Sequence, residues 1–240
     1  MSAGWVGARR VPIMRSVSAF PESWMNLFDQ PLQLIAVLFA LSILPLLVVL
    51  GTSFLKLSVV FALLRNALGT QQIPPNIALH GLALVLTMFV MAPVGLAIQD
   101  NLAAHPVRID DKDFTQQVEK TILAPYRAFL ERNTAPDQVR FFADVGHRTW
   151  PEPYRNRIPD DSLIVLLPAF TVSQLIEAFK IGLLLFLPFI AIDLIVSNVL
   201  LAMGMMMVSP MTIALPLKLL VFVLIHGWEK LIGQLLLSFS

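Results

Sequence analysis

A methionine-rich stretch in the C-terminal part of the chain has a composition suited to a specific physical task. Four of the ten methionines fall within Met203–Met207, where only Gly204 interrupts them. Methionine is unbranched and polarisable, so it packs against surfaces of varied shape, and glycine gives the backbone freedom. Because Met205, Met206 and Met207 cannot all lie on one face of a helix, ordinary core packing explains them poorly. The composition suits a flexible apolar ring around a changing cargo. The alternative is that the methionines fill space in a core.

Asp193 is the second unusual feature, because it lies in the apolar run Leu187–Leu194. An ionisable group in such a setting is costly and is therefore a candidate functional residue. Lys218 lies on the return arm of the same predicted hairpin. A turn near Ser209 would leave the two at unequal distances from it, so they pair either across an unevenly bent hairpin or between neighbouring subunits. We favour a structural ion pair over a proton or ion relay. Four more charges are structural ion-pair candidates: Lys56, Arg65, Glu177 and Lys180.

No residue pattern typical of catalysis occurs in the sequence. It contains no HExxH, GxSxG, P-loop or dinucleotide-binding fingerprint. It has no cysteine, which excludes disulfides, thiolate metal sites and a cysteine nucleophile. The histidines are scattered, and the acidic cluster Asp110–Asp113 lacks the spacing and the distal glutamate of an EF-hand. We therefore expect no catalytic residue, no metal site, no cofactor and no enzymatic activity.

The composition indicates a membrane protein or a subunit buried in a larger assembly. Apolar residues make up 57% of the 240 residues, charged residues make up 14%, and the mean hydropathy is +0.75. Ordinary soluble domains carry about 25% charged residues, and disordered chains lack this much apolar sequence. The net charge of +1 provides no field for nucleic acid, so we expect no nucleic-acid partner.

The charges are concentrated in one segment, which divides the chain into four parts. Residues 100–161 hold 20 of the 33 charged residues, whereas Leu32–Leu55 and Ile77–Gln99 hold none. We predict a leader over residues 1–30, a first apolar helical hairpin over 31–99, a polar helical domain over 100–162, and a second apolar hairpin over 163–240. The leader lacks the apolar core and cleavage site of a signal peptide. It is either a flexible extension or a mis-called start, with Met14 and Met25 as the alternative start sites.

Each apolar run is about 20 residues or longer, which is enough to cross a bilayer core of about 30 Å. Hydropathy alone therefore predicts four membrane helices. Lys56, Arg65 and the prolines within the runs argue against four regular spans, because proline bends a helix and frees carbonyl groups. A helix that is apolar all round faces either lipid or other subunits, and both environments fit these runs.

The polar segment is predicted to be helical and to face water. Apolar residues spaced three and four apart, from Phe114 through Tyr126 to Leu130, lie on one face of a helix that Asp113 can cap. Thr134 begins a second helix as its N-cap, with Pro136 in the first turn. This domain either docks or oligomerises, or it forms a solvated cap over the apolar helices.

Long stretches of the sequence resemble one family. Residues 192–213, IDLIVSNVLLAMGMMMVSPMTI, closely resemble the signature of the FliP/SctR (YscR/HrcR) family, the R-type core subunits of the type III secretion export apparatus. Ser197–Asn198 and Val208–Pro210 resemble the virulence injectisome branch more than the flagellar branch. The resemblance covers roughly residues 27–240 and includes LPLL (44–47), TSFLK (52–56), FALLRNALG (61–69), QIPPN (72–76), MAPVG (91–95), LAPYR (123–127), LLPAFTVS (166–173) and LPLKLL (215–220).

This resemblance implies a fold, a function and partners. Family members form a homo-pentamer that joins S-type and T-type subunits in a helical, cone-shaped export channel, largely on the periplasmic side of the bacterial inner membrane. The chain would then be an all-α, non-enzymatic subunit of two long, kinked apolar hairpins flanking a small helical polar domain. The other partners implied are the U-type switch and V-type export gate subunits, inner rod and needle proteins, unfolded secretion substrates and membrane lipid.

The resemblance also implies roles for single residues. Met205, Met206 and Met207 match a pore-lining gasket that limits leakage, and Met203 and Gly204 belong to the same gate stretch. Asp193 and Lys218 match charged positions that hold hairpins or subunits together. From the residues alone, a self-contained ion or solute transporter using Asp193 is the alternative. Such a transporter should contain internal repeats with matching broken helices, and the two apolar hairpins show no convincing match.

Overall fold

The computed structural model describes residues 31–70, 74–105, 114–155 and 157–239. All regular secondary structure in these ranges is helical, which confirms the all-α prediction. Helices α4 (Asn76–Ala104) and α9 (Leu163–Ala202) are each long and apolar enough to cross a membrane. Counting each of two bent helix pairs as one span raises the number to four. The predicted leader and the Asp113 cap lie outside the described residues, and the cone-shaped oligomer stays a prediction.

The chain divides into two compact units, residues 1–46 and 47–240. The described part of the first unit belongs to helix α2 (Pro31–Gly51), whose last residues lie in the second unit. This helix carries no charge and exposes Ile35, Phe39 and Leu41. The four-part division based on charge stays a prediction.

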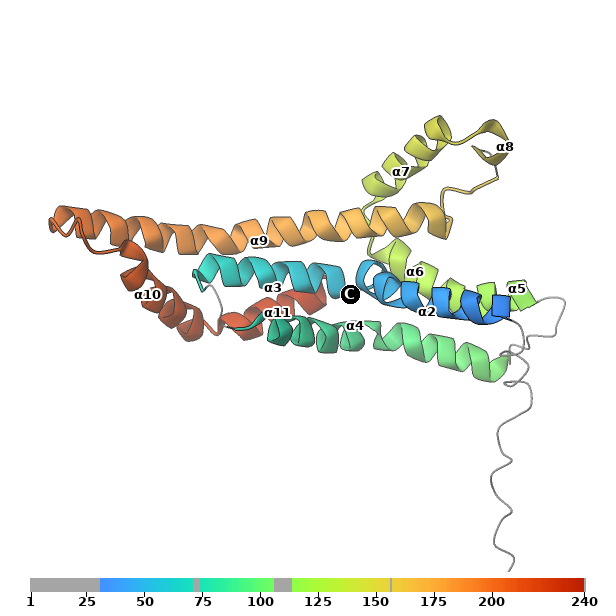
Figure 1. Ribbon diagram of the computed structural model, residues 1–240, viewed down its shortest axis with the longest axis horizontal. Coiled ribbons are helices and arrows are strands. Elements are labelled where there is room, and N and C mark those ends of the chain that lie inside the picture. The colour runs from blue at the N-terminus through green and yellow to red at the C-terminus, as the bar shows by residue number, and fades with distance from the viewer. Residues whose placement is uncertain (1–30, 71–73, 106–113, 156, 240) are drawn as a thin grey trace, which may run out of the picture. The chain divides into compact units, whose positions relative to one another are not determined.

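The core of the second unit forms around helix α3 (Phe54–Leu68). Leu57, Phe61 and Leu64 recur at intervals of three and four, so they share one buried face of this helix. The face belongs to a cluster with residues of α4, α9, α10 (Pro210–Leu224) and α11 (Gly227–Leu237). Figure 1 shows α3 lying along α9. Helix α4 also contacts α3 and lies below it in this view. Gly182 of α9 permits this close approach, because a Cβ atom there would collide with Leu63 of α3.

The polar segment is a continuous helical run followed by two separate helices. In chain order these are α5 (Phe114–Val118), the π-helical turn η1 (Glu119–Leu123), α6 (Ala124–Arg132), α7 (Pro136–Thr149) and α8 (Glu152–Arg155). Both α6 and α7 contact α9. Phe129 and Leu130 of α6 form a second core with Leu166 and Phe170 of α9, so the polar segment is anchored to the apolar helices.

Pro125 contributes to the π-helical turn through its missing N–H. In a regular α-helix that group would bond the carbonyl of Thr121. Instead Asn101 Nδ2 of α4 donates to Thr121 O at 3.4 Å, and Ala124 N donates to Glu119 O in the wider π pattern. A side chain of a neighbouring helix thus replaces the lost backbone bond.

The predicted cap of the second polar helix is wrong. α7 begins at Pro136 with Ala135 in the cap position, and Thr134 Oγ1 donates back to Leu130 O at 2.6 Å. Ala135 N donates to Ser173 Oγ of α9 at 3.0 Å. The backbone N–H at the start of α7 is therefore bonded by a side chain of another helix. The local Thr–Ala–Pro–Asp pattern does not reveal this contact.

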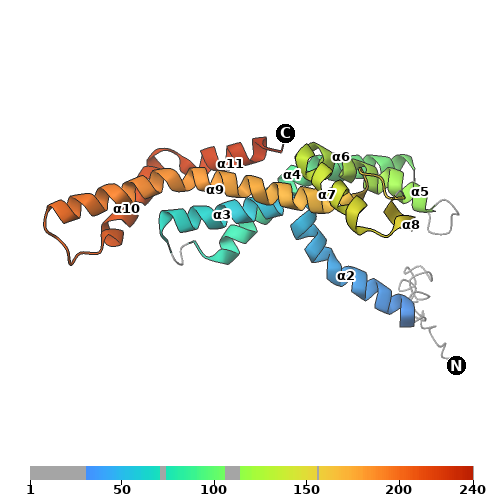
Figure 2. The same cartoon turned by 90° about the horizontal axis from the view of Figure 1, so that it is seen from above.

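In the second unit, two prolines lie inside one continuous helix, whereas a sharp change of direction separates the helices on either side of His226. Pro168 and Pro188 both lie inside the 40-residue α9. In contrast, α10 and α11 differ in direction by 62° at His226, whose φ of 53° is left-handed. The second apolar hairpin therefore has one long arm and one sharply bent arm (Figure 2).

Candidate functional site

The methionine stretch forms the loop that joins α9 to α10, at the end of α9 remote from α7 (Figure 1). Met203 caps α9, and Gly204 has a left-handed φ of 73°. Gly204 N donates to Leu201 O, and Met205 N donates to Leu200 O, both at 3.0 Å. These two bonds form a Schellman motif, which needs a residue of positive φ that glycine supplies without strain. Gly204 therefore has a geometric role in directing the loop.

The methionine side chains of this loop are exposed in the single chain. Met207 is fully exposed, Met206 is 81% exposed and Met203 is 67% exposed. The two arms of the hairpin pack together next to the loop, where Val196 and Leu200 of α9 form a cluster with Ala214 of α10. The loop is thus an apolar tip on a packed hairpin, and exposed apolar surface of this kind indicates an interaction site.

Lys218 joins three helices behind the loop. Its Nζ donates to Asp193 Oδ2 at 2.7 Å and to Ala67 O at 3.2 Å. Ala67 lies in the last turn of α3, where carbonyl groups lack helical partners and the helix dipole favours a cation. Lys218 is 5% exposed, whereas the Asp193 side chain is 44% exposed. The buried ammonium group therefore ties α10 to both α9 and α3.

The pairing of Asp193 with Lys218 needs no uneven bend, because the turn is a loop and not a point at Ser209. α9 ends at Ala202 and α10 begins at Pro210. Asp193 lies about as far before the loop as Lys218 lies after it. Counting from Ser209 adds the whole loop to one arm, which is why the spacing looks unequal in the sequence.

A second buried lysine lies near the N-terminal end of α3. Lys56 is fully buried, and its Nζ lies 2.5 Å from Glu177 Oε2 of α9. The same Nζ lies 4.3 Å from the ring centre of Phe239, which provides a cation–π contact. Lys56 therefore joins α3 to α9 and to the residues that follow α11.

The two remaining charged candidates are not brought to a carboxylate among the described residues. Arg65 Nη1 donates to Asn76 Oδ1, at the start of α4. Lys180 is exposed on α9, one turn from Glu177, which pairs with Lys56 instead.

Two hydroxyl groups that sequence reasoning missed lie at the break between α2 and α3. Tyr126 OH donates to Gly51 O at 2.7 Å, and Thr171 Oγ1 lies 3.2 Å from Leu50 O and 2.8 Å from Leu167 O. The carbonyls of residues 50 and 51 are at a helix end and lack regular partners. A Cβ atom at Gly51 would collide with the Tyr126 hydroxyl, so this glycine makes room for the bond. Burial raises the pKa of Tyr126 to about 12.

The described residues contain no group of three histidine, aspartate or glutamate side chains that could hold a metal ion. Their buried charges join helices, and their exposed methionines offer a soft apolar surface. The ion pairs can hold the helices together, and the methionines can contact another apolar surface.

These features define a class of protein: an all-helical, strongly apolar subunit with helices of membrane-spanning length and an exposed methionine loop. The chain belongs to the FliP family, whose model matches residues 37–235.

Relatives of injectisome type confirm the branch that the sequence motifs predict. Virulence protein YscR of Salmonella typhimurium is 58% identical over 217 residues, which cover 90% of this chain and all of that protein. The Yop proteins translocation protein R of Yersinia pestis is 54% identical over 87% of this chain and 96% of its own length. The harpin secretion protein HrcR of Erwinia amylovora is 45% identical over 88% of this chain and 97% of its own length.

Proposed function

We propose that this chain is a channel-forming subunit of a type III secretion export apparatus, through which unfolded proteins cross the bacterial inner membrane. The observation that carries the proposal is the methionine loop, whose apolar side chains stay exposed at the tip of a packed hairpin. Membership of the FliP family supports the secretion part, as do relatives named for translocation and harpin secretion.

The channel requires several copies of the chain, because two apolar hairpins do not enclose a protein-sized pore. The exposure of the helices supports assembly. The 29-residue α4 buries only Leu79, Ala83 and Thr87, and α9 exposes a long series of leucine and isoleucine side chains. Such surfaces are covered by lipid or by other subunits. The family resemblance favours a homo-pentamer joined to S-type and T-type subunits.

In this assembly the candidate residues have two roles. Met205, Met206 and Met207 form a soft gasket around the pore, with Met203 beside them, and Gly204 sets the direction of the loop. Asp193 with Lys218, and Lys56 with Glu177, keep the helices in register so that the loops of neighbouring copies meet. The energy for transport comes from other parts of the apparatus, and this subunit catalyses no reaction.

The proposed location is the inner membrane, with the assembled complex largely on its periplasmic side and the polar segment in the periplasm. The partners beyond the S-type and T-type subunits are the U-type and V-type subunits, the inner rod and needle proteins, and the unfolded substrates. The abundant apolar helices support a membrane location.

Native mass spectrometry of the detergent-extracted full chain tests the proposal, with the chain expressed alone and together with its S-type and T-type partners. We expect a multimer of this chain that recruits both partners. A monomer or dimer that binds neither partner, and that moves ions across liposomes, would overturn the proposal in favour of the transporter. The present geometry does not favour that alternative, because Lys218 already pairs with Asp193.

A further inference from the structure

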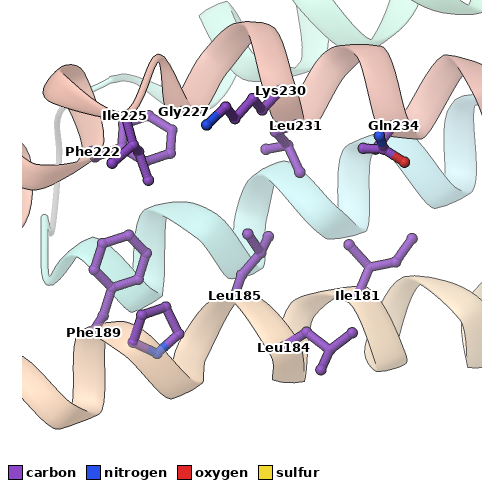
Figure 3. Close-up of a pocket in the computed structure, with 11 residues that line it drawn as sticks. Ile181, Leu184, Leu185, Phe189, Phe222, Ile225, Gly227, Lys230, Leu231 and Gln234 are labelled. Atoms are coloured by element: carbon purple, nitrogen blue, oxygen red, sulfur yellow. The ribbon is translucent and has the colours of Figure 1, made fainter.

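An apolar groove of about 380 Å³ lies between α9 and the bent arm formed by α10 and α11 (Figure 3). Its floor and walls come from Leu184, Leu185 and Phe189 of α9, Phe222 of α10 and Leu231 of α11. Grooves of about 300–1,000 Å³ with apolar walls are typical of small-ligand sites. The groove is separate from the methionine loop and from both buried lysines.

The groove exists because the chain turns sharply where α10 meets α11. His226 adopts a left-handed conformation, and a Cβ atom at Gly227 would collide with the Phe222 ring. The two helices differ in direction by 62°. The start of α11 is therefore held apart from α9, and the groove lies between them (Figure 3). At one end of the groove the Phe189 and Phe222 rings pack with their centres 6.3 Å apart.

Among the described residues that line the groove, Lys230 alone is charged. It is exposed, and no carboxylate of the described residues pairs with its ammonium group. Its neighbour Glu229 is outside the lining and lies 3.8 Å from His226. The opposite wall is formed by α9. Lys180 of this helix is exposed and lies one helical turn from Leu184, so it adds a second positive charge near the Leu184 end of the groove.

We propose that this groove binds one acyl chain of an anionic phospholipid, with Lys230 contacting the lipid phosphate. Apolar walls match the chain, and an unpaired cation at the rim matches the head group. Basic pockets between membrane helices bind anionic head groups in this way. A lysine can lay its aliphatic stem along an apolar wall while its ammonium group reaches the polar region. An apolar helix from a partner would instead cover Lys230 without supplying a negative charge, which is costly.

The test counts lipids that remain on the purified full chain after extraction from vesicles of equal phosphatidylglycerol and phosphatidylcholine. We expect native mass spectra to show retained phosphatidylglycerol in excess. Lys230→Gln should lower its retention about fivefold, which is the effect of one lysine near an anionic head group. Leu184→Trp, which fills the groove, should remove it. Lys120→Gln and Leu194→Trp are the matched controls, because both residues are exposed and lie outside the groove.

The remaining outcomes overturn the proposal. Equal retention of the two lipids would remove the role of charge, and unchanged retention in Lys230→Gln would remove the role of this residue. Displacement of the lipid by inorganic phosphate alone would identify a free-anion site. Occupation of the groove by a second copy would be revealed if Leu184→Trp abolished multimers while lipid retention stayed normal.

Discussion

Lys56 and Lys218 hold opposite ends of α3 against α9. Each is buried, and each pairs with a carboxylate that is about half exposed. Burying an ammonium group is costly unless it is paired and hydrogen-bonded. Glu177 and Phe239 reduce this cost at one end of α3, and Asp193 and Ala67 O reduce it at the other. Because water reaches the carboxylates but not the ammonium groups, each lysine depends on its carboxylate more than the carboxylate depends on the lysine.

Removing Asp193 should destabilise the protein more than removing Lys218. Asp193→Asn leaves a buried ammonium group without its carboxylate, and we expect a loss of about 2–3 kcal/mol in unfolding free energy together with reduced assembly. Lys218→Met leaves a half-exposed carboxylate that solvent can stabilise, so the expected loss is about 1 kcal/mol. Denaturant unfolding in detergent measures both. Asp137→Asn, which breaks an exposed pair with Arg140, is the control and should change stability by less than about 0.5 kcal/mol. Equal losses for the two single variants would contradict this account.

Tyr126 predicts a pH dependence at the break between α2 and α3. Its pKa in the folded protein is about 12, and the tyrosine of an unfolded chain ionises near 10. The stability contributed by the neutral hydroxyl is present below pH 10 and is lost as the pH rises toward 12, because the unfolded state releases its proton first. The wild type should therefore be more stable than Tyr126→Phe at pH 8, and the difference should shrink above pH 10. A constant difference from pH 8 to 12, in thermal unfolding, would be evidence against a buried neutral hydroxyl.

At single positions, the sequence reveals which residues are unusual and not what they touch. Asp193 and Lys218 are conspicuous because they interrupt apolar runs. Tyr126 and Thr171 are not, because they are ordinary residues whose partners are backbone carbonyls far away in the chain. A local pattern carries no information on such contacts.

At the scale of helices, periodicity and breaking residues predict more. The three- and four-residue spacing of apolar side chains in α3 gives its buried face directly. The prolines predict the ends of helices poorly, since α9 continues through Pro168 and Pro188. The end of α9 depends on Gly204, whose left-handed conformation closes the helix, and the sequence pointed to this glycine for its flexibility only.

Gly204→Ala should destabilise the end of α9. An alanine in the left-handed region costs about 1–2 kcal/mol, although open space surrounds the position. We expect a lower Tm and a displaced methionine loop. Gly233→Ala is the matched control, because it also meets no neighbouring atom but lies inside α11, where alanine is favoured over glycine by about 1 kcal/mol. The control should raise the Tm or leave it unchanged. A lowering of the Tm by both variants to the same extent would show that backbone conformation at Gly204 is not the cause.

At the scale of the molecule, the strongest feature is apolar surface that the chain itself does not cover. α4 and α9 have membrane-spanning length, yet their exposed side chains do not by themselves distinguish lipid from protein neighbours. Hydropathy anticipates the apolar surface but not its partners, because both environments select the same residue types. The methionine loop is the part of that surface whose chemistry is most specific, since its side chains are adaptable as well as apolar.

Replacing Met205, Met206 and Met207 with alanine should open a leak through the assembled complex without preventing its assembly. Alanine keeps the surface apolar but removes the long, adaptable side chains, so loops from neighbouring copies would no longer meet. The Asp193–Lys218 pair and the Val196, Leu200 and Ala214 cluster lie outside the loop and should hold the hairpin unchanged. Ion flux through the complex in liposomes measures the leak, and native mass measures the assembly. Met88→Ala, at an exposed methionine of α4, should leave both at the wild-type level. If the triple variant assembles and remains as ion-tight as the wild type, the loop does not seal the pore, and the gasket role would have to pass to another surface of the channel.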